Sequence, residues 1–390
     1  MCEEEWDGME EWKECKLKDI CDYGKGRTEV SSLDNSTYIS TENMLPNRAG
    51  ITIATTLPTG EYTPSFELND TLVSNIRPYF KKIWKATFSG GCSADVLVFK
   101  AKENISKDYL YYVLADDEFF KYSMATSKGT KMPRGDKTSI MNYPINLPPL
   151  PTQQKIADIL SPLDDKIELN NKINTNLEQQ VQALFKNWFV DFEPFGGKMP
   201  EGWEVGKLSD IADYLNGLAM QKFRPLEDEE GLPVLKIKEL RQGCYDESSE
   251  LCSPSKVKPE YIIHDGDVIF SWSGSLLVDI WCGGTCGLNQ HLFKVTSQTY
   301  EKWFYYLWTK HHLDRFIFLA ADKATTMGHI KREELDKAEV IIPDDTTYQN
   351  LTSVIKPFID EIINNRIENR KLSQIRDGLL PKLMNGEIEV

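Results

Sequence analysis

Long apolar runs and a secretion signal are both missing from this sequence of 390 residues. No stretch approaches the roughly eighteen uninterrupted apolar residues that a membrane-spanning helix requires. The N-terminal segment, MCEEEWDGMEEWKEC, is acidic and lacks the apolar core of a secretory signal. The eight cysteines are scattered, which is ordinary thiol usage inside a cell. These absences predict a cytoplasmic protein without a membrane span.

Catalytic signatures are missing as well. The sequence has no GxxxxGK[ST], HExxH, GxSxG or GxGxxG string, and no NPPY-like motif of the adenine methyltransferases. Cys282 and Cys286 form a CxxxC string without a companion pair, which favours buried thiols in a glycine-rich turn over a zinc site. His311 and His312 lie among aromatic residues at helical spacing, which favours packing over catalysis. The sequence therefore predicts a binding protein with no metal and no cofactor of its own.

Positive charge is in the minority, with 45 Lys and Arg against 60 Asp and Glu, a formal net charge of -15. This balance argues against a simple basic protein that coats DNA, although it leaves room for a local basic surface. Hydrophobic residues make up 41% and aromatic residues 11% of the chain, so packed domains are expected and general disorder is excluded. The length favours more than one hydrophobic core.

An internal repeat is the strongest feature that the sequence does contain. Several short strings recur in the same order with a period near 195 residues, which indicates a tandem duplication. At an offset of 191, the repeated residues are Trp12, Lys16, Leu17, Asp19, Ile20, Asp22, Tyr23 and Gly26, matched by Trp203, Lys207, Leu208, Asp210, Ile211, Asp213, Tyr214 and Gly217. Further matches pair DTLVS with DVIFS, Asp70 with Asp267, and Ser74 with Ser271.

Each half changes character once along its length. Its first part mixes short apolar strings typical of strands, such as VLVFKA and DVIFSW, with aromatic segments at helical spacing. Its last part is a long helical segment preceded by prolines. The predicted fold class is therefore α+β, with two pseudo-symmetric mixed domains and two long helices. The predicted parts are an acidic extension (1–11), a first mixed domain (12–150), a central long helix (151–195), a second mixed domain (196–345) and a C-terminal long helix (346–390).

The two helical segments carry apolar residues in alternating steps of four and three, the 3.5-residue repeat of a coiled coil. Two asparagines interrupt each seam: Asn170 and Asn174 in the first helix, and Asn365 and Asn369 in the second. Buried asparagines weaken a seam but define its register. An antiparallel pair places Asn170 opposite Asn369 and Asn174 opposite Asn365, whereas a parallel pair places Asn170 beside Asn365; solvent-facing asparagines in a broken seam are the third alternative.

The ends of these helices are marked by prolines and by threonines. Pro162 and Pro357 fall in the first turns, so each helix either bends there or starts only after its proline. Thr152 in the first helix and Thr346 or Thr347 in the second are the candidate N-caps.

Basic residues gather in a glycine-containing loop of each half. Residues 121–137 contain five Lys or Arg against one Asp, and small residues there would let backbone N–H groups approach phosphate. This pattern favours nucleic acid over a merely solvated surface. The predicted DNA-binding residues of the first half are Lys128, Thr130, Lys131 and Arg134, with Arg77 near the DNA backbone. Those of the second half are Thr326, His329, Lys331 and Arg332, with Asn289 and Gln290 as candidates for base-edge contact.

The chain resembles the specificity subunit of Type I restriction–modification enzymes. The resemblance covers nearly the whole chain and is carried by the two WxxxKLxDI strings, DTLVSNIRP, the GTxM-type loop, PPLPTQQKIADILSPLDDKIELNN, LEQQVQALFKNWFVDFEPF and LLPKLMNGEIEV. It implies two target-recognition domains that each bind half of a bipartite, asymmetric sequence in double-stranded DNA, separated by spacer helices in an antiparallel coiled coil. It also implies two methyltransferase subunits that bind S-adenosylmethionine and a motor endonuclease that uses ATP and Mg²⁺.

Two other functions remain open from the residues alone. One is a non-catalytic scaffold whose two modules bind protein or RNA, and the other is an enzyme with its active site between a module and a helix. Between the shared residues the halves diverge, since residues 26–52 have no close counterpart in residues 217–243. Two recognition modules of this kind are therefore expected to read different base sequences. The acidic extension has no place in the repeat.

Overall fold

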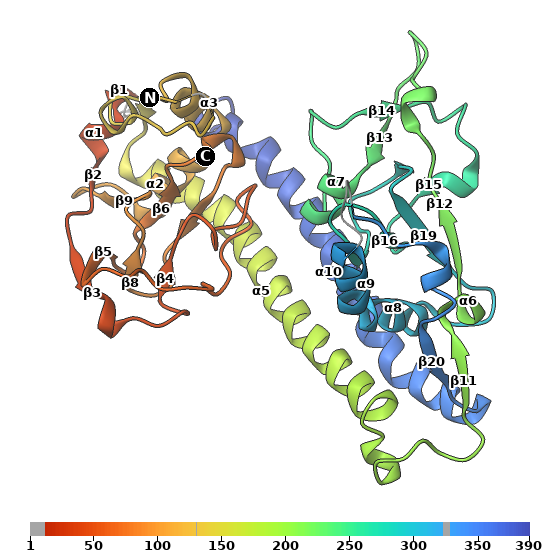
Figure 1. Ribbon diagram of the computed structural model, residues 1–390. Coiled ribbons are helices and arrows are strands. Elements are labelled where there is room, and N and C mark those ends of the chain that lie inside the picture. The colour runs from red at the N-terminus through yellow and green to blue at the C-terminus, as the bar shows by residue number, and fades with distance from the viewer. Residues whose placement is uncertain (1–11, 130, 323–327) are drawn as a thin grey trace, which may run out of the picture. The chain divides into compact units, whose positions relative to one another are not determined.

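The computed structural model describes residues 12–129, 131–322 and 328–390, which form two compact units (Figure 1). The first unit extends to Glu168 and also includes Leu372–Val390, while the second comprises Leu169–Lys371. Each unit is mixed α/β, and parts of two 40-residue helices, α5 (Leu150–Phe189) and α10 (Asp345–Met384), belong to each. The prediction of two mixed domains with long helices is therefore confirmed. Among the described residues, no helix is long and apolar enough to cross a membrane.

The first unit contains three antiparallel or mixed sheets. A four-stranded antiparallel sheet has the order β2-β9-β6-β7, and a second sheet has the order β3-β5-β8-β4 with β4 parallel to β8. Strands β1 and β10 form a two-stranded ribbon in which Lys13 is opposite Leu147. The strands are β1 (Lys13–Lys16), β2 (Cys21–Tyr23), β3 (Arg27–Glu29), β4 (Tyr38–Ile39), β5 (Tyr62–Phe66), β6 (Thr71–Ser74), β7 (Ile83–Lys85), β8 (Gly90–Cys92), β9 (Val96–Ala101) and β10 (Pro144–Leu147).

The second unit repeats this plan with one change. Its antiparallel sheet has the order β12-β19-β16-β17, its ribbon is β11-β20, and its remaining sheet has the order β14-β13-β18-β15 with β13 parallel to β18. The additional strand of that sheet lies beside β13, whereas in the first unit it lies beside β5. The strands are β11 (Glu204–Lys207), β12 (Asp213–Asn216), β13 (Leu232–Leu235), β14 (Leu251–Cys252), β15 (Ile262–Ile263), β16 (Val268–Ser271), β17 (Leu277–Ile280), β18 (Cys286–Leu288), β19 (Leu292–Thr296) and β20 (Glu339–Ile342).

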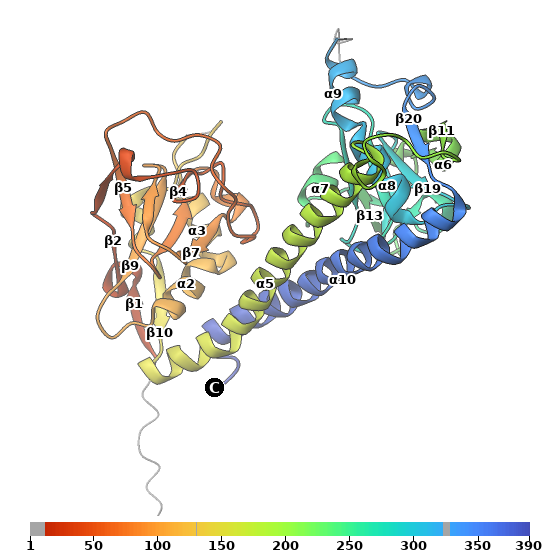
Figure 2. The ribbon, with the colours of Figure 1, turned by 90° about the horizontal axis from the view of Figure 1, so that it is seen from below.

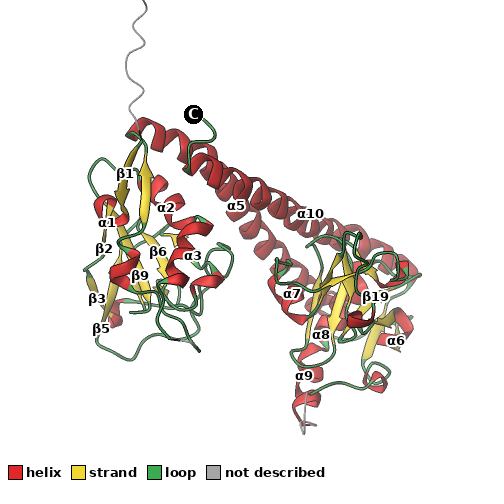
Figure 3. Ribbon diagram, turned by 90° about the horizontal axis from the view of Figure 1, so that it is seen from above, coloured by secondary structure: helices red, strands yellow, loops and turns green. Residues whose placement is uncertain are grey.

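Helices cover one side of each antiparallel sheet and bury its central strand. In the first unit α2 (Lys107–Ala115) lies against β6, β7 and β9, and α3 (Asp117–Ala125) follows it (Figure 3). In the second unit α8 (Lys302–His311) takes the same position against β16, β17 and β19, followed by α9 (Leu313–Asp322). All four residues of β6 and all four of β16 are buried, because the other sheet of each unit packs on the opposite face: Leu72 shares a core cluster with Phe66, and Ile269 shares one with Leu288. Short helices complete the units: α1 (Leu17–Ile20), α4 (Lys137–Ile140), α6 (Leu208–Ile211) and α7 (Ile237–Gln242).

The long helices contribute apolar residues to the core of each unit. Ile156 and Leu160 of α5 and Leu380 and Leu383 of α10 belong to the core of the first unit. In the second unit, Phe189 of α5 packs on Trp303 of α8 and Phe185 packs on Trp308, in the same cluster as Leu351 and Ile355 of α10. The helices are therefore held by burial of one apolar face rather than by helix propensity alone.

The helix starts differ from two of the expectations. Pro162 and Pro357 lie inside α5 and α10, so the alternative that each helix starts only after its proline is wrong. Thr152 lies within α5 and is not its cap. At α10, Asp344 accepts the N–H of Thr347 at 3.0 Å and its hydroxyl at 2.7 Å, so an aspartate rather than a threonine occupies the capping position. A carboxylate is favoured there because it satisfies free N–H groups and interacts well with the positive end of the helix dipole.

His312, at the end of α8, is a packing residue of the second unit. Its Nε2 lies 2.7 Å from the carbonyl oxygen of Glu339 in β20, so a neutral ring with its proton on Nε2 donates this hydrogen bond. The ring also stacks on Trp308, with centroids 6.1 Å apart. Burial lowers the pKa of His312 to about 4, because the charged form loses its hydration.

Replacing His312 by Gln is expected to flatten the pH dependence of stability. A depressed folded-state pKa favours folding above the unfolded value of about 6.5, and this contribution is lost as the pH falls toward 4. The wild-type chain should therefore lose on the order of 1–2 kcal/mol more than the variant between pH 7 and pH 4.5, after allowance for partial exposure. Urea midpoints at both pH values measure this, with His264→Gln, at an exposed position, as the control; equal slopes for His312→Gln and wild type would contradict it.

Candidate nucleic-acid interface

Three separate segments of the first unit meet at the end of β6. The N–H of Asn75 donates to the carbonyl oxygen of Asp95 at 2.8 Å, and the N–H of Gly135 donates to that of Asn75 at 3.2 Å. The N–H of Arg77 donates to the carbonyl oxygen of Pro133 at 2.8 Å. These backbone bonds bring the predicted basic loop to the edge of the sheet, beside Arg77.

The charged side chains around this junction are held by carboxylates but stay open to solvent. The Arg134 guanidinium donates to Asp95 at 3.1 Å, and 53% of its side chain is exposed. Lys128 binds Asp136 with 81% of its own side chain exposed. That ammonium, together with the N–H and hydroxyl of Ser139, lowers the pKa of Asp136 to about 2. Lys131 is exposed at the tip of the loop. These cations form an accessible surface that can approach a phosphate backbone.

The second unit builds the same junction with different residues. The N–H of Trp272 donates to the carbonyl oxygen of His291 at 3.4 Å, and the N–H of Ile330 donates to that of Trp272 at 3.1 Å. The N–H of Gly274 donates to the carbonyl oxygen of Gly328 at 2.9 Å. Asn75, Arg77, Asp95 and Arg134 of the first unit thus correspond to Trp272, Gly274, His291 and His329 of the second, since Ile76–Arg134 and Ser273–His329 are the two matching bridges.

The side chains of the second junction are mostly neutral and aromatic. The indole N–H of Trp272 donates to Oδ1 of Asn216 at 2.9 Å, and the Trp272 ring is near the rings of both His291 and His329, with centroid distances of 6.2 Å each. The hydroxyl of Ser273 lies 2.9 Å from Nδ1 of His291. Two junctions with one backbone plan but different donors, acceptors and rings are suited to different base sequences.

The predicted site residues fall into four groups. Lys128, Lys131, Arg134 and Arg77 are brought together in the first unit. His329 lies in the second junction, and Lys331 and Arg332 follow it; Arg332 donates to the carbonyl oxygen of Tyr214 at 3.1 Å. Gln290 is half-buried with Nε2 3.3 Å from Nε2 of His291, while Asn289 is 7% exposed and its Oδ1 accepts the N–H of His291. Thr130 and Thr326 lie outside the described residues.

Sequence reasoning missed Asn75, Asp95, Trp272 and His291, all of which lie at the junctions. The repeat contained a signal for these positions, because aligning Ser74 with Ser271 also aligns Asn75 with Trp272 and Arg77 with Gly274. Position alone did not indicate that these residues reach the basic loops, since the contacts join segments about sixty residues apart in the sequence.

A hollow in the first unit lies close to this junction. It has a volume of about 480 Å³, and its lining includes Lys25, Arg27, Tyr62 and Ser93. Arg27 lies over the ring of Tyr62 at 5.9 Å, and Tyr62 is 45% exposed. Ser93 and Ala94 of its lining directly precede Asp95 in the chain, and Arg27 over an exposed tyrosine ring gives the hollow an aromatic and cationic character that suits nucleic acid.

Helices α5 and α10 run beside each other (Figure 2), and within the second unit their side chains interact directly. Nδ2 of Asn170 donates to Oδ1 of Asn369 at 2.9 Å, and Nδ2 of Asn365 donates to Oδ1 of Asn174 at 2.9 Å. Asn170, Asn174 and Asn365 are buried. As the residue numbers rise along α5 they fall along α10, which is the geometry of antiparallel neighbours. The amide pairs satisfy most of the polar atoms that would otherwise be costly to bury, although Oδ1 of Asn170 is buried without a partner.

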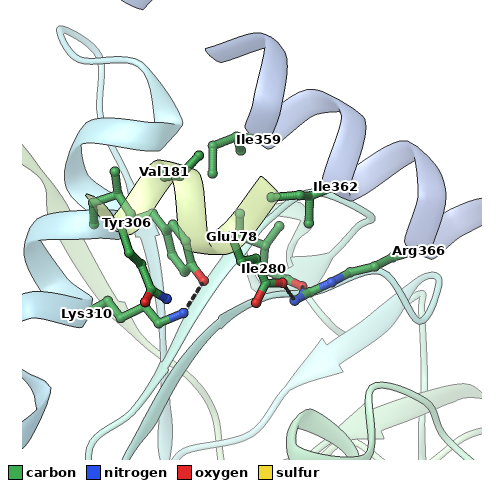
Figure 4. Close-up of a pocket in the computed structure, with 10 residues that line it drawn as sticks. Glu178, Val181, Ile280, Tyr306, Lys310, Ile359, Ile362 and Arg366 are labelled. Atoms are coloured by element: carbon green, nitrogen blue, oxygen red, sulfur yellow. Dashed lines mark hydrogen bonds and ion pairs between the residues drawn. The ribbon is translucent and has the colours of Figure 1, made fainter. Parts of the chain in front are cut away.

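The hollow beside these helices is too small for a cofactor. Arg366 of α10 donates to Glu178 of α5 at 2.8 Å, and Lys310 donates to the hydroxyl of Tyr306 at 3.2 Å (Figure 4). The space between them is about 10 Å³, room for about one water molecule.

Nothing in the described part of the chain groups three or more His, Cys, Asp or Glu side chains as a metal site. The Cys282 and Cys286 thiols are buried, and desolvation raises their pKa to about 11 and about 12. Such thiols are protonated at neutral pH and are poor nucleophiles and poor metal ligands.

The fold and the two junctions define a duplicated two-unit protein whose equivalent basic and aromatic surfaces carry different side chains. The chain belongs to the Type I restriction modification DNA specificity domain family, whose model matches residues 9–179 and 200–375. It is 31% identical to the Type I restriction enzyme MjaIX specificity subunit of Methanocaldococcus jannaschii over 310 residues, covering 74% of this chain and 71% of the relative. It is 25% identical to the HindI specificity subunit of Haemophilus influenzae, covering 97% and 100%.

A solved structure supports the fold alone. The crystal structure of the Type-I restriction-modification system S subunit from M. genitalium aligns with a TM-score of 0.55 at 14% identity, covering 97% of this chain and 98% of that one. The predicted resemblance to Type I specificity subunits is therefore confirmed at the level of the family.

Proposed function

We propose that this chain is the DNA-specificity subunit of a Type I restriction–modification complex and that it binds a bipartite, asymmetric site in double-stranded DNA. Each unit recognises one half of the site through the junction at the end of its central strand. The observation that carries this proposal is that the two junctions share their backbone hydrogen bonds but differ at four matched side-chain positions. If the duplication served packing alone, nothing would favour different side chains at these four positions.

The spacer helices form an antiparallel coiled coil in this proposal. The Asn170–Asn369 and Asn174–Asn365 pairs support it, since amide pairs inside a seam define one register and one orientation. A defined register keeps the gap between the two half-sites constant. A constant gap raises the effective concentration of the second half-site once the first is bound.

In this proposal the partner subunits catalyse adenine methylation and DNA cleavage, and the chain itself is non-catalytic. Two methyltransferase subunits bind S-adenosylmethionine and act on adenine, and a motor endonuclease subunit uses ATP and Mg²⁺. Partner subunits also supply part of the phosphate contact, which makes a net charge of -15 compatible with DNA binding.

A base-resolution map of methylated adenines tests this function. The map compares a host that expresses this gene and its methyltransferase partner with the same host lacking the gene. We expect a split motif, with two different short halves around a constant gap, that appears only when the gene is present. Absence of any gene-dependent motif, with the partner shown to be active, would reject the proposal and favour a scaffold that binds protein or RNA.

A further inference from the structure

Arg77 adopts a backbone conformation that arginine rarely takes. Its φ is 51° and its ψ is 64°, in the left-handed region, directly before the short 3₁₀ segment η2 (Pro78–Phe80). Left-handed residues other than glycine are uncommon because Cβ crowds the backbone, and they concentrate at functional sites. Such a residue persists only where its surroundings or its role account for it.

The other left-handed residues of the first unit are accounted for by their side chains. Asn47, Asn69 and Asn104 are of the type that tolerates this region best. Arg48 and Lys81 both bind Asp117, so an ion pair accompanies each of these two conformations. Arg77 differs from them.

The Arg77 side chain has no partner among the residues that the structure describes. It makes no hydrogen bond or ion pair there, and its Nε is buried without an acceptor. The residue is half-buried, whereas Lys128, Lys131 and Arg134 around it are exposed. A guanidinium has five N–H donors in a rigid planar arrangement, and leaving a buried one such as the Nε–H of Arg77 unpaired is costly unless a ligand accepts it.

The second unit shows which residue this backbone position favours. Gly274, the residue matched to Arg77, has a φ of 67° and makes the equivalent backbone hydrogen bond. Glycine adopts this region without steric cost. The duplicated framework therefore requires a left-handed residue at this position, and the first unit has an arginine there although glycine fits the backbone better. What distinguishes the two units at this position is the side chain.

We infer that Arg77 reads a base edge in the first half of the DNA site and is a specificity-determining residue, in place of the backbone contact expected from the sequence. This inference rests on the proposed function. The exposed cations surround it and suit phosphates, whereas a recessed side chain on a constrained backbone suits a contact of defined geometry. The donor pattern fits two acceptors on one edge, and guanine O6 and N7 in the major groove are the pair that arginine binds best.

Replacing Arg77 by Gly tests the inference, because the variant removes the side chain and keeps a residue suited to the backbone. The assembled complex is bound to duplexes that carry the mapped site or single base-pair changes at each position of both halves. We expect Arg77→Gly to lose about tenfold or more of the discrimination at one base pair of the first half. Discrimination at the other positions and throughout the second half should remain.

Two further variants separate the effect of charge from that of donor geometry, and the first unit from the second. Arg77→Lys retains the charge but not the planar pair of donors, so it should resemble Arg77→Gly in specificity while binding more tightly. Gly274→Ala is the matched variant in the second unit: its Cβ makes an ordinary contact 3.6 Å from Ile237 but is strained by the left-handed φ of 67°, so any effect should fall on the second half and leave the first half unaffected.

Several outcomes would overturn the inference. Equal weakening on all duplexes, with a salt dependence reduced by about one contact, would assign Arg77 to a phosphate. Unchanged binding and specificity would show that it contacts no DNA. If the wild-type complex discriminates at no position of either half, the proposed function itself fails, which is distinct from both of these results.

Discussion

Replacing Arg376 by Met is expected to lower the free energy of unfolding of the first unit by about 3–5 kcal/mol. Arg376 interrupts the apolar pattern of α10 and is only 4% exposed. Its Nη1 lies 2.6 Å from Oδ1 of Asp164 in α5, and its Nη2 lies 2.9 Å from Asp377. The hydroxyl of Tyr112 donates to the other Asp164 oxygen at 2.9 Å. Removal of the arginine leaves Asp164 partly buried without its counter-charge.

The size of the effect depends on the orphaned charge rather than on the lost contact. A buried ion pair contributes little net stability compared with apolar residues, but removing one partner leaves the other uncompensated. The double variant Asp164→Asn with Arg376→Met should therefore recover much of the loss. Asp377→Asn, at a position whose side chain is 47% exposed, should cost less than about 1 kcal/mol.

Hydrogen exchange in α2 and in residues 372–384, followed through a urea titration, measures this unit separately from the second. The result that would contradict the prediction is an Arg376→Met variant as stable as wild type, or a double variant no better than the single one. Either result would mean that Asp164 is well hydrated without Arg376.

The combined substitution of Lys131 and Arg134 by Ala is expected to weaken DNA binding by the assembled complex by about 10- to 100-fold at physiological salt. Two phosphate contacts are lost, so the slope of log affinity against log salt should fall by about two. Removing Arg134 also frees Asp95, its partner at 3.1 Å, and places an unpaired carboxylate toward the phosphates. The weakening should affect all sequences alike, in contrast to Arg77→Gly.

The matched control removes the same charge elsewhere in the first unit. Lys18 and Lys107 are exposed on α1 and α2, outside the segments that form the junction, and the double variant Lys18→Ala with Lys107→Ala should bind almost as wild type does. Filter binding or fluorescence anisotropy at several salt concentrations provides the affinities, and size-exclusion chromatography checks assembly with the methyltransferase subunit. Loss of assembly in Lys131→Ala with Arg134→Ala would show a structural role and contradict the prediction.

Much of the fold could be predicted because it depends on local patterns. The repeat, the mixed character of each half and the long helices follow from periodicity and from matched residues such as Trp12 and Trp203. Helix starts were predicted less well, since Asp344 rather than a threonine caps α10. Several residue types can accept a hydrogen bond from a free N–H at a helix start, so the path of the backbone determines which residue becomes the N-cap.

The candidate site was predicted only in part. Charge and glycine content identified the loop with Lys128, Lys131 and Arg134, because exposed cations near small residues are a property of the sequence itself. Asn75, Asp95, Trp272 and His291 were missed because their position depends on hydrogen bonds between segments far apart in the chain. The asparagines of the helices were identified by their spacing, while the partner of each was left open among the alternatives.

The sequence by itself determined the duplication, the mixed α/β class of each half, the seam of the helices and the family, because each of these depends only on residue type and spacing. Only the tertiary structure decided that Arg77 and Gly274 share one left-handed backbone position, and that Arg134 and His329 occupy matching places beside it. The reason is physical: backbone torsion and contacts between distant segments arise when the sheets and loops pack together. A linear pattern specifies which residues are available, whereas packing decides which of them meet.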